Sequence, residues 1–234
     1  MKNQITLYIL LIVSLLSFSN CELEDPTIGV TTDEIISLKS SVPELLADGE
    51  ARIRLTAELL EKADPNLDIT FQTEAGSFPL AGEGVRIATL TASGRVAEIT
   101  LQSDNANTGQ VIVSATVGNY TKSLNIDFQS ALPDDIVSEA DRQTVTADRV
   151  DFAQITTNLY RDMGLPTIGT RVNYEVIELD SATASIVPFD FVNEDLQSIV
   201  NVKSDNGKSG VVQVVISAEG EAESEVIEIV FEEE

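Results

Sequence analysis

The chain carries the same alternating pattern twice, with a period of about 100 residues. In the first copy, apolar residues occupy every second position from Ile53 to Leu59, and polar residues lie between them. A period of two is typical of a strand with one buried face and one solvent-exposed face. Further runs of this kind in the first copy lie at 67–73, 97–101, 111–117 and 124–128. After the first 20 residues no stretch has a sustained helical period, so the sequence predicts an all-β fold built from sandwiches of antiparallel sheets.

Short segments show how the two copies align. The matched pairs are Ala47-Asp48-Gly49 with Ala147-Asp148-Arg149, Leu59 with Leu159, Ser103-Asp104-Asn105 with Ser204-Asp205-Asn206, and Phe128 with Phe231. Each copy has the length of an ordinary small domain. The sequence therefore predicts two tandem β-sandwich domains, at 34–130 and 142–234. The segment 131–141 is predicted to be the linker between them.

Both copies resemble a known family, the bacterial immunoglobulin-like domain of group 1, found in invasin and intimin. The family's marks include Ala-Asp-Gly before the second strand and a later turn of the form D-x-x-G-x-P-x-x-G. The second copy keeps that turn better, at Asp162–Gly169, with one residue instead of two between the Asp and the first glycine, whereas the first copy has a degraded version at Lys62–Leu67. In the second copy Arg149 replaces the glycine of Ala-Asp-Gly. The resemblance covers about residues 34–234 and implies an immunoglobulin-like fold used as a rigid spacer, a stalk or, in some members, an adhesin.

Residues 1–20 are predicted to be the signal peptide of a bacterial lipoprotein. Lys2 supplies the positive start, and the apolar core Ile5–Leu16 is shorter than the roughly 20 residues that span a bilayer. Cys21, the only cysteine, follows directly and is the predicted lipidation site, with 21–33 as lipid attachment and tether. The acidic residues Glu22–Asp25 resemble the export signal of Bacteroidetes surface lipoproteins. The sequence thus predicts a lipid-anchored protein of the outer membrane, exposed at the cell surface; the alternative is a soluble secreted protein cut nearby.

The charge of the chain limits its partners. The formal net charge is −25, from 14 Lys and Arg against 39 Asp and Glu. Nucleic acids and anionic lipids both need cationic patches, so no nucleic-acid partner is expected, and membrane contact is expected only through the lipid. Hydrophobic residues make up 43% of the chain, which is enough to build folded cores.

Residues that carry catalysis are mostly missing. The chain has no His, which leaves no Ser-His-Asp or Cys-His pair and no His-bearing zinc site. No glycine-rich nucleotide-binding motif occurs. Paired carboxylates for glycoside hydrolysis remain possible on composition alone, but Trp is absent and aromatic residues are 5% of the chain. The sequence therefore predicts no enzyme, no catalytic residues and no cofactor.

Acidic turns raise the possibility of calcium binding. Asp104-Asn105 and Asp205-Asn206 lie in equivalent turns, and Asp134-Asp135 lies in the predicted linker. Calcium takes six to eight oxygen ligands, often from Asp and Asn in loops. The favoured interpretation is that these side chains accept hydrogen bonds from their own turns. No metal site is predicted.

Few aromatic residues are candidates for an exposed binding face. Phe71 and Tyr174 are predicted to be equivalent core positions, on the third strand of each sandwich. Tyr160 departs from the apolar phase of its strand and is the best candidate for an exposed aromatic. Phe189 and Phe191 are predicted to pack within the second sandwich.

Two classes of function remain after these exclusions. The first is a structural or interaction module, in which the tandem domains act in adhesion or as a spacer for a protein or glycan partner at the cell surface. The second is an accessory protein that captures glycans beside an outer-membrane uptake system. Carbohydrate binding normally uses exposed planar aromatic side chains, which are scarce here.

Overall fold

The structure is a computed structural model that describes residues 29–220 and 222–233. Within these residues the chain forms strands β1 to β17 and one short 3-10 helix, η1. The all-β prediction is therefore confirmed. Cys21 and the signal peptide lie outside the described residues.

Strands β1 to β8 form the first sandwich, called domain 1. One sheet has the order β1-β3-β6, and the other has the order β2-β8-β7-β4-β5. The bounds are η1 Thr32–Glu34, β1 Ile36–Ser40, β2 Glu44–Ala47, β3 Arg52–Leu59, β4 Asp68–Thr73, β5 Ile87–Thr91, β6 Val96–Gln102, β7 Gly109–Val117 and β8 Tyr120–Ser130.

Strands β9 to β17 form the second sandwich, domain 2. Its sheets have the orders β13-β15-β11-β9 and β10-β17-β16-β12-β14. The bounds are β9 Asp135–Ala140, β10 Thr144–Thr146, β11 Ala153–Tyr160, β12 Arg171–Glu178, β13 Ala184–Ser185, β14 Phe189–Phe191, β15 Gln197–Ser204, β16 Gly210–Ala218 and β17 Glu225–Glu232.

The two domains share one strand order, apart from β13, which adds a fourth strand to one sheet of domain 2. Ile36 pairs with Leu59 across β1 and β3, and Ile136 pairs with Leu159 across β9 and β11. In both domains one short strand pairs in parallel with the last strand, β2 with β8 and β10 with β17. The sequence repeat thus corresponds to one sandwich plan used twice, which agrees with the predicted tandem immunoglobulin-like domains.

Each sandwich has its own core, because alternate residues of facing strands point inward. The core of domain 1 contains Leu55 and Phe71, and the core of domain 2 contains the equivalent Ile155 and Tyr174. Phe71 is 0% and Tyr174 4% exposed, which confirms the predicted burial of both residues.

The predicted linker requires a correction. Residues 131–141 contain β9, which pairs with β11 and therefore belongs to domain 2. Ile136 is the only fully buried residue of β9, so this strand lacks the apolar alternation that marks β3 and β11. Only residues 131–134 connect the last strand of domain 1 to the first strand of domain 2.

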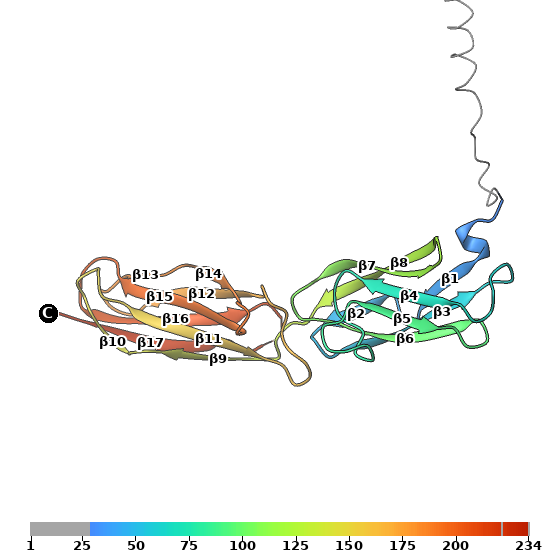
Figure 1. The fold of residues 1–234 in the computed structure, drawn as a ribbon. Coiled ribbons are helices and arrows are strands. Elements are labelled where there is room, and N and C mark those ends of the chain that lie inside the picture. Colours follow the sequence, from blue (N-terminus) through green and yellow to red (C-terminus); the bar gives the residue numbers. More distant parts are fainter. Residues whose placement is uncertain (1–28, 221, 234) are drawn as a thin grey trace, which may run out of the picture.

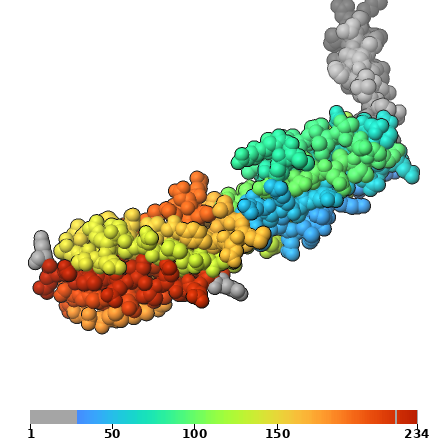
Figure 2. Space-filling view, turned by 90° about the horizontal axis from the view of Figure 1, so that it is seen from below, coloured from blue at the N-terminus to red at the C-terminus, as the bar shows by residue number. Residues whose placement is uncertain are grey.

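The domains lie end to end (Figures 1 and 2). The described chain enters domain 1 near η1, at the end that faces away from domain 2, and it leaves domain 2 at the opposite end of the molecule (Figure 1). In each domain we call the end from which the last strand leaves the distal end. The distal end of domain 1 is the one that meets domain 2.

Candidate functional site

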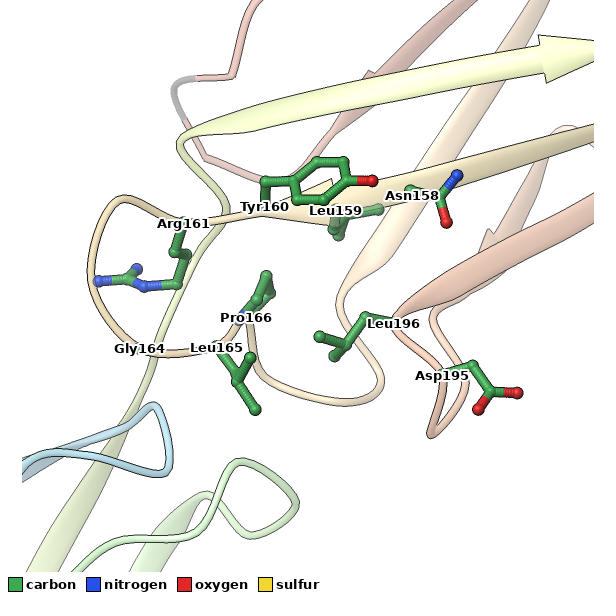
Figure 3. Close-up of a pocket in the computed structure, with 9 residues that line it drawn as sticks. All are labelled: Asn158, Leu159, Tyr160, Arg161, Gly164, Leu165, Pro166, Asp195 and Leu196. Carbon is green, nitrogen blue, oxygen red and sulfur yellow. The ribbon is translucent and has the colours of Figure 1, made fainter.

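The most extensively built site in the described chain is the junction between the two domains. The loop between β11 and β12, residues 161–170, projects from domain 2 onto the distal end of domain 1 (Figure 3). The Leu165 N–H donates to the Asp48 carbonyl at 2.8 Å, and the Ile168 N–H donates to the Asn105 carbonyl, also at 2.8 Å. The junction is therefore made partly from backbone groups, whose geometry is well defined on both sides.

Thr167 is buried and links the loop to domain 1 and to the connecting segment 131–134. Its hydroxyl donates to the Ala47 carbonyl at 3.0 Å and accepts from the Ala131 N–H at 2.7 Å. Its own N–H donates to the Ala131 carbonyl at 2.9 Å. A buried hydroxyl needs such partners, because an unsatisfied one costs about 1–3 kcal/mol.

Gly164 lets the loop approach domain 1 closely. Its φ is +71°, and a Cβ at this position would lie 2.8 Å from the Asp48 Cβ. Only glycine combines this left-handed conformation with so short a backbone approach. On the domain 1 side, the Asp48 carboxylate accepts hydrogen bonds from the N–H groups of Glu50 and Ala51, which hold the receiving turn in shape.

The connecting segment 131–134 is also tied to domain 2. The Arg161 guanidinium donates to the carbonyls of Leu132 and Met163. The Asp162 N–H donates to the Asp134 carboxylate at 2.9 Å. One acid of the predicted linker pair is thus used as a backbone acceptor at the junction.

A small pocket of about 250 Å³ lies beside this loop, on the domain 2 side. Tyr160, Pro166 and Leu196 surround it, while Arg161 and Asp195 point away (Figure 3). Tyr160 is 50% exposed, which confirms the sequence prediction for this side chain.

A larger pocket of about 590 Å³ lies at the other end of domain 1, next to the start of the described chain. Ile35, Leu67 and Tyr120 contribute to its lining. Beside it, Lys62 forms an ion pair of 2.7 Å with Glu34, and this contact together with the Thr31 N–H lowers the pKa of the Glu34 carboxyl.

The acidic turn at Asp104 has the chemistry predicted for it. Its carboxylate accepts hydrogen bonds from the N–H groups of Gly76, Ala106 and Asn107, at 2.8, 3.1 and 2.9 Å. Partial burial would raise the pKa of Asp104, but these hydrogen bonds outweigh it and the pKa is lowered.

The equivalent turn of domain 2 is held by other side chains, because the Ser204 hydroxyl there accepts from the Gly207 N–H at 3.0 Å. At the Asp205-Asn206 turn, the Asn206 side chain accepts from the Lys208 N–H at 3.1 Å. No cluster of three or more candidate metal ligands occurs in the part of the chain that the structure describes.

The Phe189–Phe191 pair differs from the prediction, because both rings are exposed, by 38% and 55%. Strand β14 pairs with β12 so that Phe191 lies opposite Arg171 and Phe189 opposite Asn173, on the outer face of the sheet. The rings meet edge to face with centroids 5.8 Å apart, and the Arg171 guanidinium lies 4.1 Å from the Phe189 centroid. The intervening Asp190 points inward and accepts from the Ser198 hydroxyl at 3.0 Å. The polar residue is therefore inside and the aromatic residues are outside.

No helix among the described residues is long and apolar enough to cross a membrane. No family model and no curated protein matches the sequence.

Solved structures show a clear likeness in fold. The Yersinia pseudotuberculosis adhesin InvE is 15% identical with a TM-score of 0.61, over 86% of this chain and 59% of that chain. Invasin, described as a bacterial integrin-binding protein, is 18% identical with a TM-score of 0.58, over 85% of this chain and 39% of that chain. The chain thus spans less than two thirds of either protein. At these identities the likeness shows the fold, which is that of invasin-type immunoglobulin-like domains.

Proposed function

We propose that this protein is a lipid-anchored cell-surface protein whose two immunoglobulin-like domains act as a spacer or adhesion module. The observation that carries the proposal is the seating of the loop 161–170 on domain 1. Contacts between domains of one chain are often loose enough for relative motion. Here Thr167 is buried between the domains, and backbone hydrogen bonds flank it on both sides. A pair of sandwiches joined in this way holds a partner at a set distance from its attachment point.

The positions of the two chain ends support the same function. The described chain begins at Gly29, beside η1, at the end of domain 1 that faces away from domain 2 (Figure 1). A lipid on Cys21 would therefore attach at one end of the module, opposite the distal end of domain 2. Stable anchoring takes two lipid signals, such as dual acylation, because a single chain holds only marginally.

A matched pair of glycine variants tests the spacer. Gly164 and Gly169 both have positive φ, +71° and +85°, but only a Cβ on Gly164 would meet domain 1. Both alanine variants carry the same kind of backbone penalty. We expect Gly164→Ala to broaden the interdomain distance distribution, measured by spin labels on the soluble fragment 22–234, and Gly169→Ala to leave it narrow. A broad distribution in the unmodified fragment would refute the rigid spacer.

The anchor is tested separately. Wild-type protein should partition into the detergent phase, and Cys21→Ser should move the protein to the aqueous phase and leave the precursor uncut. Equal partitioning of the two would contradict lipidation while leaving the spacer untouched.

The second candidate is glycan capture at the cell surface. The exposed Phe189 and Phe191 side chains favour it, because aromatic rings on an outer face can stack on sugars. Arg171 covers one face of Phe189, which leaves Phe191 as the better platform. A glycan array probed with the soluble fragment and with Phe191→Ala measures this: binding that the variant loses would favour capture over the spacer alone.

A further inference from the structure

The two domains present the same turn at their distal ends. In domain 1 the Asp48 carboxylate accepts from the N–H groups of residues 50 and 51, and in domain 2 the Asp148 carboxylate accepts from those of residues 150 and 151. The next residue has positive φ in both, +77° at Gly49 and +69° at Arg149. The backbone of the receiving turn is therefore present twice, although only the copy in domain 1 contacts another domain in this structure.

In domain 1 the turn at Asp48 and the turn at Asn105 bind the loop 161–170 of domain 2. The Asp48 carbonyl accepts from Leu165, and the Asn105 carbonyl accepts from Ile168. The Asn105 side-chain amide donates to the Pro166 carbonyl at 3.3 Å. Gly49 has no side chain that could obstruct the loop, and a Cβ added at this position would lie 4.0 Å from the Leu165 Cδ1.

In domain 2 the groups equivalent to those of Asn105 are already occupied from within. Asn206 stands where domain 1 has Asn105, and its carbonyl accepts from the Arg149 guanidinium at 2.9 Å. The Asn206 side-chain amide donates to the Ser181 carbonyl at 2.8 Å. The Arg149 side chain also lies over Gly207, where a Cβ would be 3.3 Å from Nε. Arg149 thus occupies the equivalent of one of the two carbonyl acceptors that the loop uses in domain 1, and it covers the surface over Gly207.

We propose that Arg149 closes the distal end of domain 2 against end-on docking by another immunoglobulin-like domain. The excluded partner is a further immunoglobulin-like domain that carries an unoccupied glycine-containing loop like 161–170, since in a second copy of this chain that loop already lies on its own domain 1. An L residue rarely adopts a φ of +69°, so this position would ordinarily favour glycine. The guanidinium contact gives a reason for a long cationic side chain at a place where domain 1 has none. The distal end of domain 2 is then a blocked docking face.

The first test places an arginine equivalent to Arg149 at the existing junction between the domains. In the soluble fragment 22–234, we expect Gly49→Arg to place a guanidinium on the Asn105 carbonyl, displace the Ile168 N–H and broaden the interdomain distance distribution. Gly49→Ala has the same backbone strain without the side chain and should keep the distribution narrow. Gly49→Met has similar length without a donor and should fall close to Gly49→Ala. If the interdomain distance distribution of Gly49→Arg stays narrow, or if that of Gly49→Met is as broad as that of Gly49→Arg, the proposed role of the guanidinium is wrong.

The second test removes the Arg149 side chain from the distal end of domain 2. The chain is extended after Glu233 by a second copy of residues 131–234, which places the added loop opposite the distal end of domain 2. With Arg149 present, we expect the added domain to tumble independently in NMR relaxation measurements. Arg149→Gly should slow it toward the tumbling rate of its neighbours, while Arg149→Gly at the free distal end of the unextended chain should change nothing. An added domain that is equally mobile, or equally fixed, with and without Arg149 would overturn the proposal.

Discussion

Removing the Tyr174 hydroxyl with Tyr174→Phe should destabilise domain 2 by about 1–2 kcal/mol. The hydroxyl lies in the core, 2.8 Å from the Ser198 Oγ and 3.2 Å from the Thr157 Oγ1. Both partners are 0% exposed, so water does not replace the lost hydrogen bonds. Ser198 keeps its hydrogen bond to Asp190, which limits the cost to the lower part of the range for unsatisfied buried groups.

Domain 1 supplies the reciprocal experiment. Ala57 and Ala97 pair across β3 and β6, as Thr157 and Ser198 pair across β11 and β15. Because the alanines offer no hydrogen-bonding group to a hydroxyl at position 71, Phe71→Tyr should cost about 1–3 kcal/mol.

A triple variant of domain 2 tests the same argument from the other side. Thr157→Ala, Tyr174→Phe and Ser198→Ala together remove donors and acceptors at once. The loss should be smaller than the sum of the three single losses, because fewer buried groups remain unpaired.

Calorimetry on the soluble fragment measures these changes, and amide hydrogen exchange assigns each transition to a domain. For a domain of this size, 1 kcal/mol corresponds to a shift of about 4–8 °C in melting temperature. If Tyr174→Phe and Phe71→Tyr both leave the melting temperature unchanged, buried polar pairing is not what distinguishes the two cores.

Three further predictions concern pH, calcium and the cores. Partial burial raises the pKa of the Asp104 carboxyl, but hydrogen bonds from Gly76, Ala106 and Asn107 outweigh it, so the folded pKa lies below the unfolded value of about 4. The ionised carboxylate therefore stabilises domain 1 above its unfolded pKa, and this contribution is lost as the pH falls through the folded pKa. Asp104→Asn should therefore flatten the fall in melting temperature between pH 5 and pH 2, whereas parallel curves would contradict this. Calcium should raise the melting temperature no more than sodium chloride of matched ionic strength, and a saturable rise that Asp104→Asn abolishes would reveal a bound ion. Leu55→Ala and Ile155→Ala should each cost about 2–5 kcal/mol in the domain that contains the change, as urea unfolding can measure, and an equal loss in both domains would show one cooperative unit.

The strands with long alternating runs could be predicted from the sequence. Residues 53–59 and 153–159 have enough positions to define a period of two, and the structure places Leu55 and Ile155 in equivalent buried sites. Strand β14 could not be predicted in this way. Three residues between Pro188 and Val192 do not define a period, and the face on which Phe189 lies depends on its pairing with β12.

The junction was only partly accessible from the sequence. The turn at 161–170 could be recognised by its glycine and proline spacing, and Gly164 is the one residue whose identity indicates a close approach. The partner surface carries no comparable signal, because the acceptors are the carbonyls of Asp48 and Asn105. Any residue type supplies a carbonyl, so only the folded arrangement reveals which ones are used. The role of Arg149 was hidden for the same reason.

The parallel pairing of β2 with β8 has a mechanical consequence. Glu44 to Ala47 pair in register with Asp127 to Ser130, and both strands run toward the distal end of domain 1. A pull between the two ends of the chain draws β8 toward the distal end and draws β2, through β1, the opposite way. The two strands are then sheared along their length, so their ladder bonds bear the load together instead of opening one at a time. Because β10 and β17 repeat this arrangement in domain 2, a load passes in series through two parallel strand pairs that are loaded in shear.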